Sequence, residues 1–443
     1  MKKIILIVLL SFAVNSFAQQ NLSLLELWQF MKENNYTLQQ QKKIIDIAAE
    51  DISIQSAGQY PVLSLGAVFN YQSEVASLEL PFALPGSPPS TIEAGVKDQY
   101  DLSLSVSQPI FTGFRTSSLI NAAQQQLLSK EIEKNVIDNE LKLAVGNLYY
   151  QSQLNLLQRK ILQESEKRID NQLDLIKNLM ASEQKTAFDT LEVANKKLNM
   201  QSQISKLTDA YKILLSKIRY LINNRNLTEL KSLDITEVAL VVPDLNQLQN
   251  LALTNRIELK LLNTQKKSVE YNKSALQSTY YPQIFANAAY HYGKPGVNFF
   301  QSEWMDYYTA GVRLQWELWN WGQSKSKVRQ TQLAIEKLDL QNEQMKNDII
   351  QQVEEAHKTL QMTQTQIKLG KNLVSVEKER YRVVKDKYEQ GLSTSIDLNN
   401  AEHDLTAAEI ELQKEYISWF QNKLMLDYAT GNIDENIEEA SNE

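Results

Sequence analysis

The sequence predicts a mostly α-helical protein made of two copies of one pattern, in which paired strands alternate with very long helices. The 443-residue chain contains only 13 Gly and 9 Pro, so turns are few and elements are long. All nine prolines lie outside residues 115–223 and 322–430, which leaves both regions free to be helical throughout. Alternating apolar and polar residues before each region predict the strands.

Two landmarks show the duplication. Pro109-Ile110-Phe111-Thr112 aligns with Glu317-Leu318-Trp319-Asn320, and Thr186-Ala187-Phe188-Asp189 aligns with Thr394-Ser395-Ile396-Asp397. Both pairs are offset by 208 positions, so neither long helix has a net insertion relative to the other. Tyr60-Pro61 and Tyr281-Pro282 are offset by 221, which makes the first hairpin 13 residues longer (221 − 208). We assign that excess to a Pro-rich loop.

The composition indicates an exported protein. Residues 1–18 have a basic start, an apolar run too short to span a membrane and small residues before Gln19, which predicts a cleaved secretory signal peptide. The formal charge of −7 argues against nucleic acid as a partner. The chain has no cysteine, which excludes disulfides and a lipid anchor on cysteine. No later stretch has the roughly 18 apolar residues of a membrane-spanning helix, so any membrane crossing would use strands.

Residues 19–223 form the first predicted repeat. It contains a helix from Leu22 to about Ser56, a hairpin over 61–111, a helix from Arg115 to Met180 and a return helix from Ala187 to about Ile222. At 1.5 Å per residue the long helix measures roughly 100 Å. Its apolar residues recur at steps of three and four, as in a coiled-coil seam. The short connection to the return helix predicts antiparallel packing.

Residues 224–243 are a predicted linker, and residues 244–430 form the second repeat. It contains a helix from Leu245 to Gln277, a hairpin over 282–318, a helix from about Gln323 to Gln390 and a return helix from about Ser395 to Ala429. The acidic residues 431–443 are expected to form a disordered tail.

The strands carry apolar residues on one face and polar residues on the other. Leu102, Leu104 and Val106 alternate with Ser103, Ser105 and Ser107. The same alternation predicts one apolar face for Leu63, Leu65, Ala67, Phe69 and Tyr71, for Ile284, Ala286, Ala288, Tyr290 and Tyr292, and for Ala310, Val312, Leu314, Trp316 and Leu318. A soluble sheet shows the same period.

Four strands are too few to close a barrel in lipid, so a membrane protein of this kind needs several chains to share one barrel. Aromatic residues crowd the ends of the second hairpin, as in the interfacial girdles of membrane barrels. We predict that the membrane-interface aromatics include Trp304, Tyr307, Tyr308, Trp316, Trp319 and Trp321. Together with the signal peptide and the missing cysteines, these residues favour the membrane interpretation over a soluble core.

The duplicated order of helix, Tyr-Pro, hairpin, long helix and capped turn resembles the TolC family of outer-membrane efflux channels. The resemblance is carried by residues 108–111, 318–322, Gly391-Leu392-Ser393 and the pairs Asp397-Leu398 and Ala401-Glu402. It implies a homotrimer in which each chain gives four strands to a 12-stranded β-barrel in outer-membrane lipid. The long helices would continue as an α-helical periplasmic barrel that meets a periplasmic adaptor protein and an inner-membrane transporter.

The resemblance also suggests functional positions at the helix turns. Gln184, Lys185, Gly391, Leu392 and Ser393 are expected to form the adaptor-docking turns. Gly391 fits a left-handed helix cap. Ser393 stands where some relatives carry an arginine that helps to close the tunnel, and Glu183 stands where the second repeat has Gly391.

Asp189, Tyr388, Asp397 and Asn400 are expected to line the periplasmic entrance. In relatives, positions equivalent to Tyr388 and Asp189 hydrogen-bond to keep the tunnel closed. In a trimer, an inward Asp397 becomes a ring of three carboxylates that favours cations. A structural alternative stays open, because both Thr186-x-x-Asp189 and Thr394-x-x-Asp397 have the form of a capping box.

Other functions have less support. His291, His357 and His403 lie in different predicted elements, so no spacing suggests a catalytic or metal site, and we expect neither enzyme activity nor a cofactor. A soluble periplasmic coiled-coil scaffold is the alternative to a channel.

Overall fold

The computed structural model describes residues 20–79, 91–181, 186–233, 235 and 239–434. The predicted signal peptide, the Pro-rich loop over residues 80–90, Gln184, Lys185 and the tail beyond Asp434 therefore lie outside the described residues. The chain divides into two compact units. The first takes in residues up to Lys42, Glu133–Leu259 and residues from Gln344 onward, and the second takes in Lys43–Ile132 and Lys260–Glu343. Each unit contains parts of both sequence repeats.

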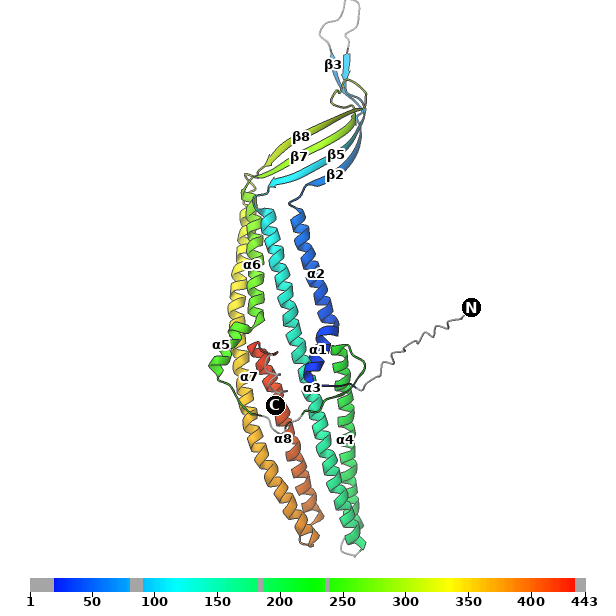
Figure 1. Ribbon diagram of the computed structural model, residues 1–443, viewed down its shortest axis with the longest axis vertical. Coiled ribbons are helices and arrows are strands. Elements are labelled where there is room, and N and C mark those ends of the chain that lie inside the picture. Colours follow the sequence, from blue (N-terminus) through cyan, green and yellow to red (C-terminus); the bar gives the residue numbers. More distant parts are fainter. Residues whose placement is uncertain (1–19, 80–90, 182–185, 234, 236–238, 435–443) are drawn as a thin grey trace, which may run out of the picture. The chain divides into compact units, whose positions relative to one another are not determined.

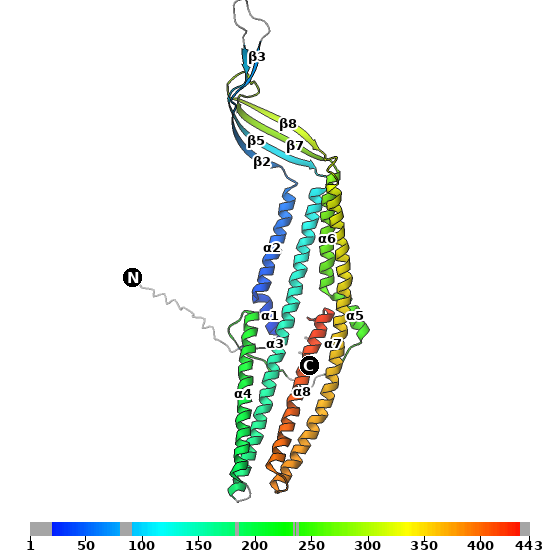
Figure 2. The same cartoon turned by 180° about the vertical axis from the view of Figure 1, so that it is seen from behind.

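The long helices confirm the duplication. Helices α3 (Arg115–Ala181) and α7 (Gln323–Glu389) have 67 residues each. Helices α4 (Ala187–Ile222) and α8 (Ser395–Thr430) have 36 residues each. Both pairs start 208 positions apart, as the sequence landmarks predict. In the first unit α3 lies beside α4 and α7 lies beside α8, in both views (Figures 1 and 2).

The second unit contains a four-stranded antiparallel sheet in the order β2-β5-β7-β8 (Figure 1). The strands are β2 (Val62–Tyr71), β5 (Asp98–Phe111), β7 (Gln283–Lys294) and β8 (Met305–Gln315). A short pair, β3 (Ala76–Glu79) with β4 (Thr91–Ala94), extends the first hairpin. The prediction that the last strand continues to Leu318 is wrong, because Gln315 pairs with Gln283, where β7 begins.

The register confirms that one apolar face runs across all four strands. Leu65 pairs with Leu104, which pairs with Tyr290, which pairs with Tyr308. Directly paired residues point to the same side of a sheet. The apolar side is exposed, since Leu65, Leu104 and Val312 are 75%, 45% and 74% accessible. A sheet that belongs to a water-soluble core would bury this face.

Helices α2 (Tyr36–Ala57) and α6 (Ile257–Gln277) lead into the sheet, and the first turns of α3 and α7 follow it. Within this unit α6 contacts both long helices. The hydroxyl of Ser268 donates to the carbonyl oxygen of Ala122 (3.2 Å), and Lys273 donates to the side-chain oxygen of Gln332 (2.8 Å). None of the described helices carries an apolar stretch long enough to span a membrane.

In the first unit, two helices predicted as continuous are each broken. The sequence predicts single helices over Leu22–Ser56 and Leu245–Gln277, but α1 (Leu24–Asn34) ends before α2, and α5 (Leu245–Asn255) ends before α6. Asn35 and Arg256 occupy the breaks with extended ψ values of 127° and 116°. The breaks are 221 positions apart, which is also the offset between Tyr60-Pro61 and Tyr281-Pro282. They therefore occupy equivalent positions in the two repeats.

The residue at each break anchors the end of the return helix of its own repeat. The side-chain amide of Asn35 donates to the carbonyl oxygen of Leu221 at the end of α4 (2.7 Å). The guanidinium of Arg256 donates to the carbonyl oxygen of Ala429 at the end of α8 (3.2 Å). These contacts supply partners to carbonyl groups that a helix end leaves unsatisfied. The breaks therefore arise from tertiary contacts as well as from local sequence.

Three apolar clusters stabilise the first unit. One gathers Trp28 and Met31 of α1 with Val145 and Tyr149 of α3, beside the parallel pair of β1 (Gln20–Leu22) and β6 (Leu227–Leu230). A second joins α5 to α7 and α8 around Trp419. The third lies near the helix turns and contains Ile176, Val193, Tyr388 and Leu398. It links the α3/α4 pair to the α7/α8 pair, which positions the candidate site.

Candidate functional site

Both predicted capping boxes are present. In α4 the carboxylate of Asp189 accepts from the backbone N–H of Thr186 (3.0 Å), while the hydroxyl of Thr186 accepts from the N–H of Asp189 (3.4 Å). In α8 Asp397 and Thr394 make the same two bonds at 3.0 and 3.1 Å. The hydrogen bonds from the hydroxyl and backbone of Thr394 lower the pKa of Asp397. Asp397 and Asn400 are both exposed.

The turn after α7 has the predicted left-handed cap at Gly391, whose φ is +73°. The N–H of Leu392 donates to the carbonyl oxygen of Lys387 (2.8 Å), and the N–H of Gly391 donates to that of Tyr388 (3.1 Å). This pair of bonds is a Schellman motif. The motif leaves the side chain of Leu392 73% exposed at the tip. The hydroxyl of Ser393 donates to the carboxylate of Asp397 at the start of α8 (3.5 Å).

Tyr388 and Asp189 are brought together through a residue that the sequence analysis did not single out. The hydroxyl of Ser395 donates to Asp189 (2.8 Å) and lies 3.2 Å from the hydroxyl of Tyr388. Tyr388 is 1% exposed and Ser395 is also buried. Thus hydrogen bonds through the Ser395 hydroxyl join α7, α8 and α4 of one chain at the helix turns.

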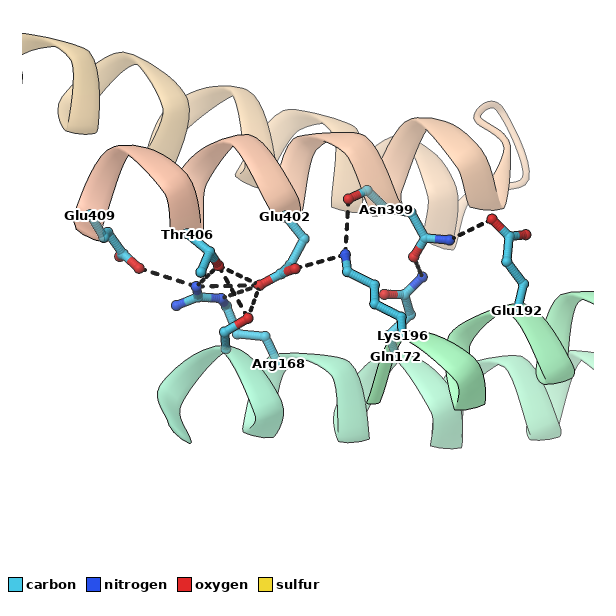
Figure 3. A network of polar contacts seen from close by, with 9 residues as sticks. Arg168, Gln172, Glu192, Lys196, Asn399, Glu402, Thr406 and Glu409 are labelled. Atoms are coloured by element: carbon cyan, nitrogen blue, oxygen red, sulfur yellow. Dashed lines mark hydrogen bonds and ion pairs between the residues drawn. The ribbon is translucent and has the colours of Figure 1, made fainter. Parts of the chain in front are cut away.

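A larger polar cluster, here called the Glu402 node, lies further along α8 (Figure 3). The carboxylate of Glu402 accepts hydrogen bonds from the hydroxyls of Ser165 and of Thr406 (2.7 Å). Its second oxygen lies 2.7 Å from the ammonium of Lys196. Arg168 contacts the same carboxylate at 3.4 Å and bonds Glu409 at 3.1 Å. The node therefore ties α8 to both α3 and α4.

Glu402 is ionised in this setting although it is only 1% exposed. Burial by itself raises the pKa of a carboxyl group. The charge of Lys196 and the hydrogen bonds from Lys196, Ser165 and Thr406 outweigh that effect, so the pKa of Glu402 is lowered. The carboxylate thus remains charged at neutral pH, with cations from two helices beside it.

Asn399 extends the node toward the helix turns (Figure 3). Its side chain accepts from Gln172 (3.1 Å) and donates to Glu192 (3.0 Å), and its backbone carbonyl accepts from Lys196 (2.9 Å). In the sequence, Glu402 was singled out only as part of the Ala401-Glu402 motif. The sequence could have predicted the burial of Glu402, because Leu398, Glu402 and Leu405 follow the i, i+4, i+7 spacing of one buried helix face. A carboxylate on such a face predicts buried cationic partners.

The predicted interface aromatics form two groups at the two ends of β8, and one of these residues, Tyr307, lies on the polar face of the sheet. Trp304 stacks on Tyr292 (4.9 Å between ring centroids), and Tyr308 pairs with Tyr290 on the apolar face. Trp316, Trp319 and Trp321 follow the other end of β8 and are all exposed. Tyr307 lies on the polar face instead, because successive strand residues alternate and Tyr307 pairs with His291.

The three histidines lie in separate surroundings. His291 lies on β7, His357 on α7 bonds the carbonyl oxygen of Pro243 (3.0 Å), and His403 is exposed on α8. Among the residues that the structure describes, no group of three or more His, Asp or Glu could hold a metal ion.

The sequence matches the outer membrane efflux protein family over residues 27–224 and 248–432. A comparison with curated proteins gives no significant match. Among solved structures, the fold is similar to CusC (TM-score 0.77, 14% identity, covering 94% of this chain and 96% of CusC). It is also similar to VceC of Vibrio cholerae (0.74, 14% identity, 92% and 96%) and to the MtrE outer membrane channel of Neisseria gonorrhoeae (0.72, 17% identity, 93% and 89%).

Proposed function

Because this chain belongs to the outer membrane efflux protein family, we propose that it is the outer-membrane channel of a tripartite efflux or type I secretion system. Three chains share one 12-stranded barrel, and their helices continue into the periplasm. An inner-membrane transporter and a periplasmic adaptor deliver the cargo, which leaves passively. The family is one of transport proteins, and the chain's role in this proposal is to conduct rather than to catalyse.

The exposed apolar face of the four-stranded sheet is the observation that carries this proposal. Leu65, Leu104 and Val312 are exposed on it, and the opposite face carries serines and Asn287. Lipid favours the first face and a water-filled lumen favours the second. Strands β2 and β8 end the sheet, and open edges are not tolerated in lipid. Pairing of β8 with β2 of the next copy closes the barrel.

Two measurements test the channel proposal. The full-length protein should be extracted from cell envelopes only by detergent and should migrate as a heat-modifiable trimer. In planar bilayers it should give discrete conductance steps. A soluble scaffold would be released without detergent and would leave the bilayer silent, and that result would refute the channel.

The helix turns are the surface that we assign to the adaptor. Gly391 and Leu392 are exposed at the tip of α7/α8, and a Schellman cap fixes the shape of this turn without help from a partner. Leu392→Glu should abolish transporter-dependent resistance or export while the amount of trimer stays constant. Tyr220→Ser removes an equally exposed side chain near the far end of α4 and serves as the control. Full transport by Leu392→Glu would exclude this docking surface.

Asp397, Asp189, Tyr388 and Asn400 belong to the proposed entrance. Asp397 is exposed and ionised, so three copies around the channel axis give a carboxylate ring that attracts cations. Its capping role is compatible with this ring, because only one carboxylate oxygen accepts the capping bonds.

Asp397→Asn separates the two roles of Asp397, since the amide oxygen can still accept the capping bond while the charge is removed. Cation selectivity and block by multivalent cations in planar bilayers should both decrease. Asp404→Asn, on the same helix but paired with Arg380 (2.9 Å), is the control. Unchanged selectivity in Asp397→Asn would leave the capping box as the whole role of this residue.

A further inference from the structure

The polar face of the sheet carries few ionisable groups, and two of them form a pair. Within the four strands, the ionisable residues whose register places them on this face are Asp101, His291, Tyr307 and Arg313. The remaining positions on the face are mainly Ser, Gly, Asn, Gln, Thr and small apolar residues. Charged side chains that line a pore control which ions pass through it.

His291 and Asp101 are in direct contact across β5 and β7. Nδ1 of His291 lies 3.0 Å and 3.3 Å from the two carboxylate oxygens of Asp101. The imidazole stacks on the ring of Tyr307 from β8, at 4.8 Å between centroids and 9° between planes. The imidazole is therefore held from both neighbouring strands.

This geometry fixes which atom takes up a proton. An ionised carboxylate only accepts hydrogen bonds, so Nδ1 carries the hydrogen in this contact and Nε2 is the other protonation site of the ring. Histidine side chains as a class change charge between pH 5 and 8. The pair is neutral when the imidazole is protonated and carries one negative charge when it is not.

Other charges are placed away from this pair. Lys294 pairs with Tyr100 and Asp306 pairs with Tyr292, which puts both charges on the apolar face. Strand β2 contributes no ionisable residue to the polar face. Arg313 pairs with Phe285, six residues from His291 along β7, which is about 20 Å of strand. That separation exceeds the screening length of about 8 Å at physiological salt.

We propose that three His291–Asp101 pairs form a pH-dependent selectivity ring in the lumen of the barrel, which carries three negative charges in mildly alkaline medium and none in mildly acidic medium. This inference rests on the proposed trimeric channel. Cationic solutes pass the ring more readily than anions when the imidazoles are neutral, and this preference declines when they are protonated.

The test is the reversal potential of the reconstituted full-length channel under a KCl gradient, measured at pH 5.5 and pH 8.0. The ratio of potassium to chloride permeability should be severalfold higher at pH 8.0. His291→Gln removes the imidazole, so the permeability ratio of this variant at pH 5.5 should equal its ratio at pH 8.0. Asp101→Asn should retain a pH shift, from a neutral ring to a positive one, with lower cation preference at both pH values.

His403→Gln is the matched control, because His403 is exposed on α8 and away from the sheet. It should keep the wild-type shift. If His291→Gln folds poorly, as judged by heat-modifiable migration, His291→Asn provides the same comparison. A full pH shift in a folded His291 variant would overturn the ring. A wild-type protein that conducts no ions would instead refute the proposed function itself.

Discussion

Glu402 shows how a single residue can connect two helical hairpins. An ionised carboxylate that is 1% exposed is tolerated only where cations and hydroxyl groups replace water. Lys196, Arg168, Ser165 and Thr406 provide this replacement from α4, α3 and α8. The contacts are specific for a carboxylate, because each partner donates to it.

The first residue-scale prediction concerns stability. Glu402→Gln should lower the free energy of unfolding by about 1–3 kcal/mol, because the amide keeps the shape but removes the charge between Lys196 and Arg168. The shift is measured from chemical denaturation of the detergent-solubilised protein. Glu411→Gln, whose partner Lys414 is exposed, should change the same quantity by less than about 0.5 kcal/mol. Equal effects of the two substitutions would contradict a stabilising role for the node.

The second residue-scale prediction concerns pH. The pKa of Glu402 in the folded protein is below its ordinary value of 4.5, so the folded state binds fewer protons there than the unfolded chain. Its contribution to stability is therefore complete above about pH 4.5 and is lost as the pH falls through the folded-state pKa. In melting experiments at a series of pH values, the melting temperature of Glu402→Gln should fall less steeply below about pH 4.5 than that of the parent protein. Parallel profiles would mean that the carboxylate does not contribute in this way.

At the scale of elements, each strand has one apolar and one polar face, because successive side chains point to opposite sides of the sheet. Leu104 belongs to the exposed apolar face, whereas Ser105 belongs to the polar face and its hydroxyl donates to the carbonyl oxygen of Ser64 (3.4 Å). In the proposed barrel, adjacent residues of one strand therefore face lipid and water, respectively.

This difference predicts unequal effects of one substitution at neighbouring positions. Leu104→Arg should impair barrel assembly, because charge on the lipid face costs about 2–4 kcal/mol near the midplane. Ser105→Arg should assemble normally, since its side chain faces water. The measurement is the fraction of heat-modifiable trimer in outer-membrane preparations. Similar losses from both variants would show that the assigned faces are incorrect.

At the scale of the whole molecule, α7 presents an apolar stripe that the described part of the chain leaves exposed. Met362, Leu369, Val376 and Val383 recur every seven residues and are all exposed, at 36–66%. A heptad spacing of exposed apolar residues is typical of a helix that packs against another helix. A second copy of the chain is the partner that a trimer supplies.

Placing charge on this stripe should weaken the trimer. Leu369→Glu combined with Val376→Glu should shift the protein from trimer toward monomer in detergent, as measured by light scattering coupled to size exclusion. Lys378→Glu changes an exposed polar residue of the same helix and should leave the trimer intact. A stable trimer in the double variant would exclude the stripe from the subunit interface.

Much of the fold could be predicted from the sequence because its signals are local and repeated. The offset of 208 between landmarks predicts the equal lengths of α3 and α7, since any insertion would shift the register of a coiled coil. Strand alternation predicts which face of β5 is apolar, and the capping boxes at Thr186 and Thr394 were predicted because they involve residues only three positions apart.

The helix breaks and the end of β8 could not be predicted in the same way. Asn35 and Arg256 interrupt apolar spacing that continues through the break, and each side chain bonds a helix end more than 170 residues away. Strand β8 stops at Gln315 because its neighbour β7 starts at Gln283. Both boundaries depend on partners that are distant in sequence.

The sequence by itself determined the duplicated order of helices and strands, the two faces of the sheet and the local caps. These features depend on periodicity and short-range hydrogen bonds, which involve residues close together in the sequence. Only the tertiary structure decided that Ser395 links Tyr388 to Asp189, that the charged carboxylate of Glu402 is paired with Lys196 and Arg168, and that His291 contacts Asp101. These contacts join residues from different elements, mostly 190 or more positions apart, and helix packing and strand register bring them within hydrogen-bonding distance.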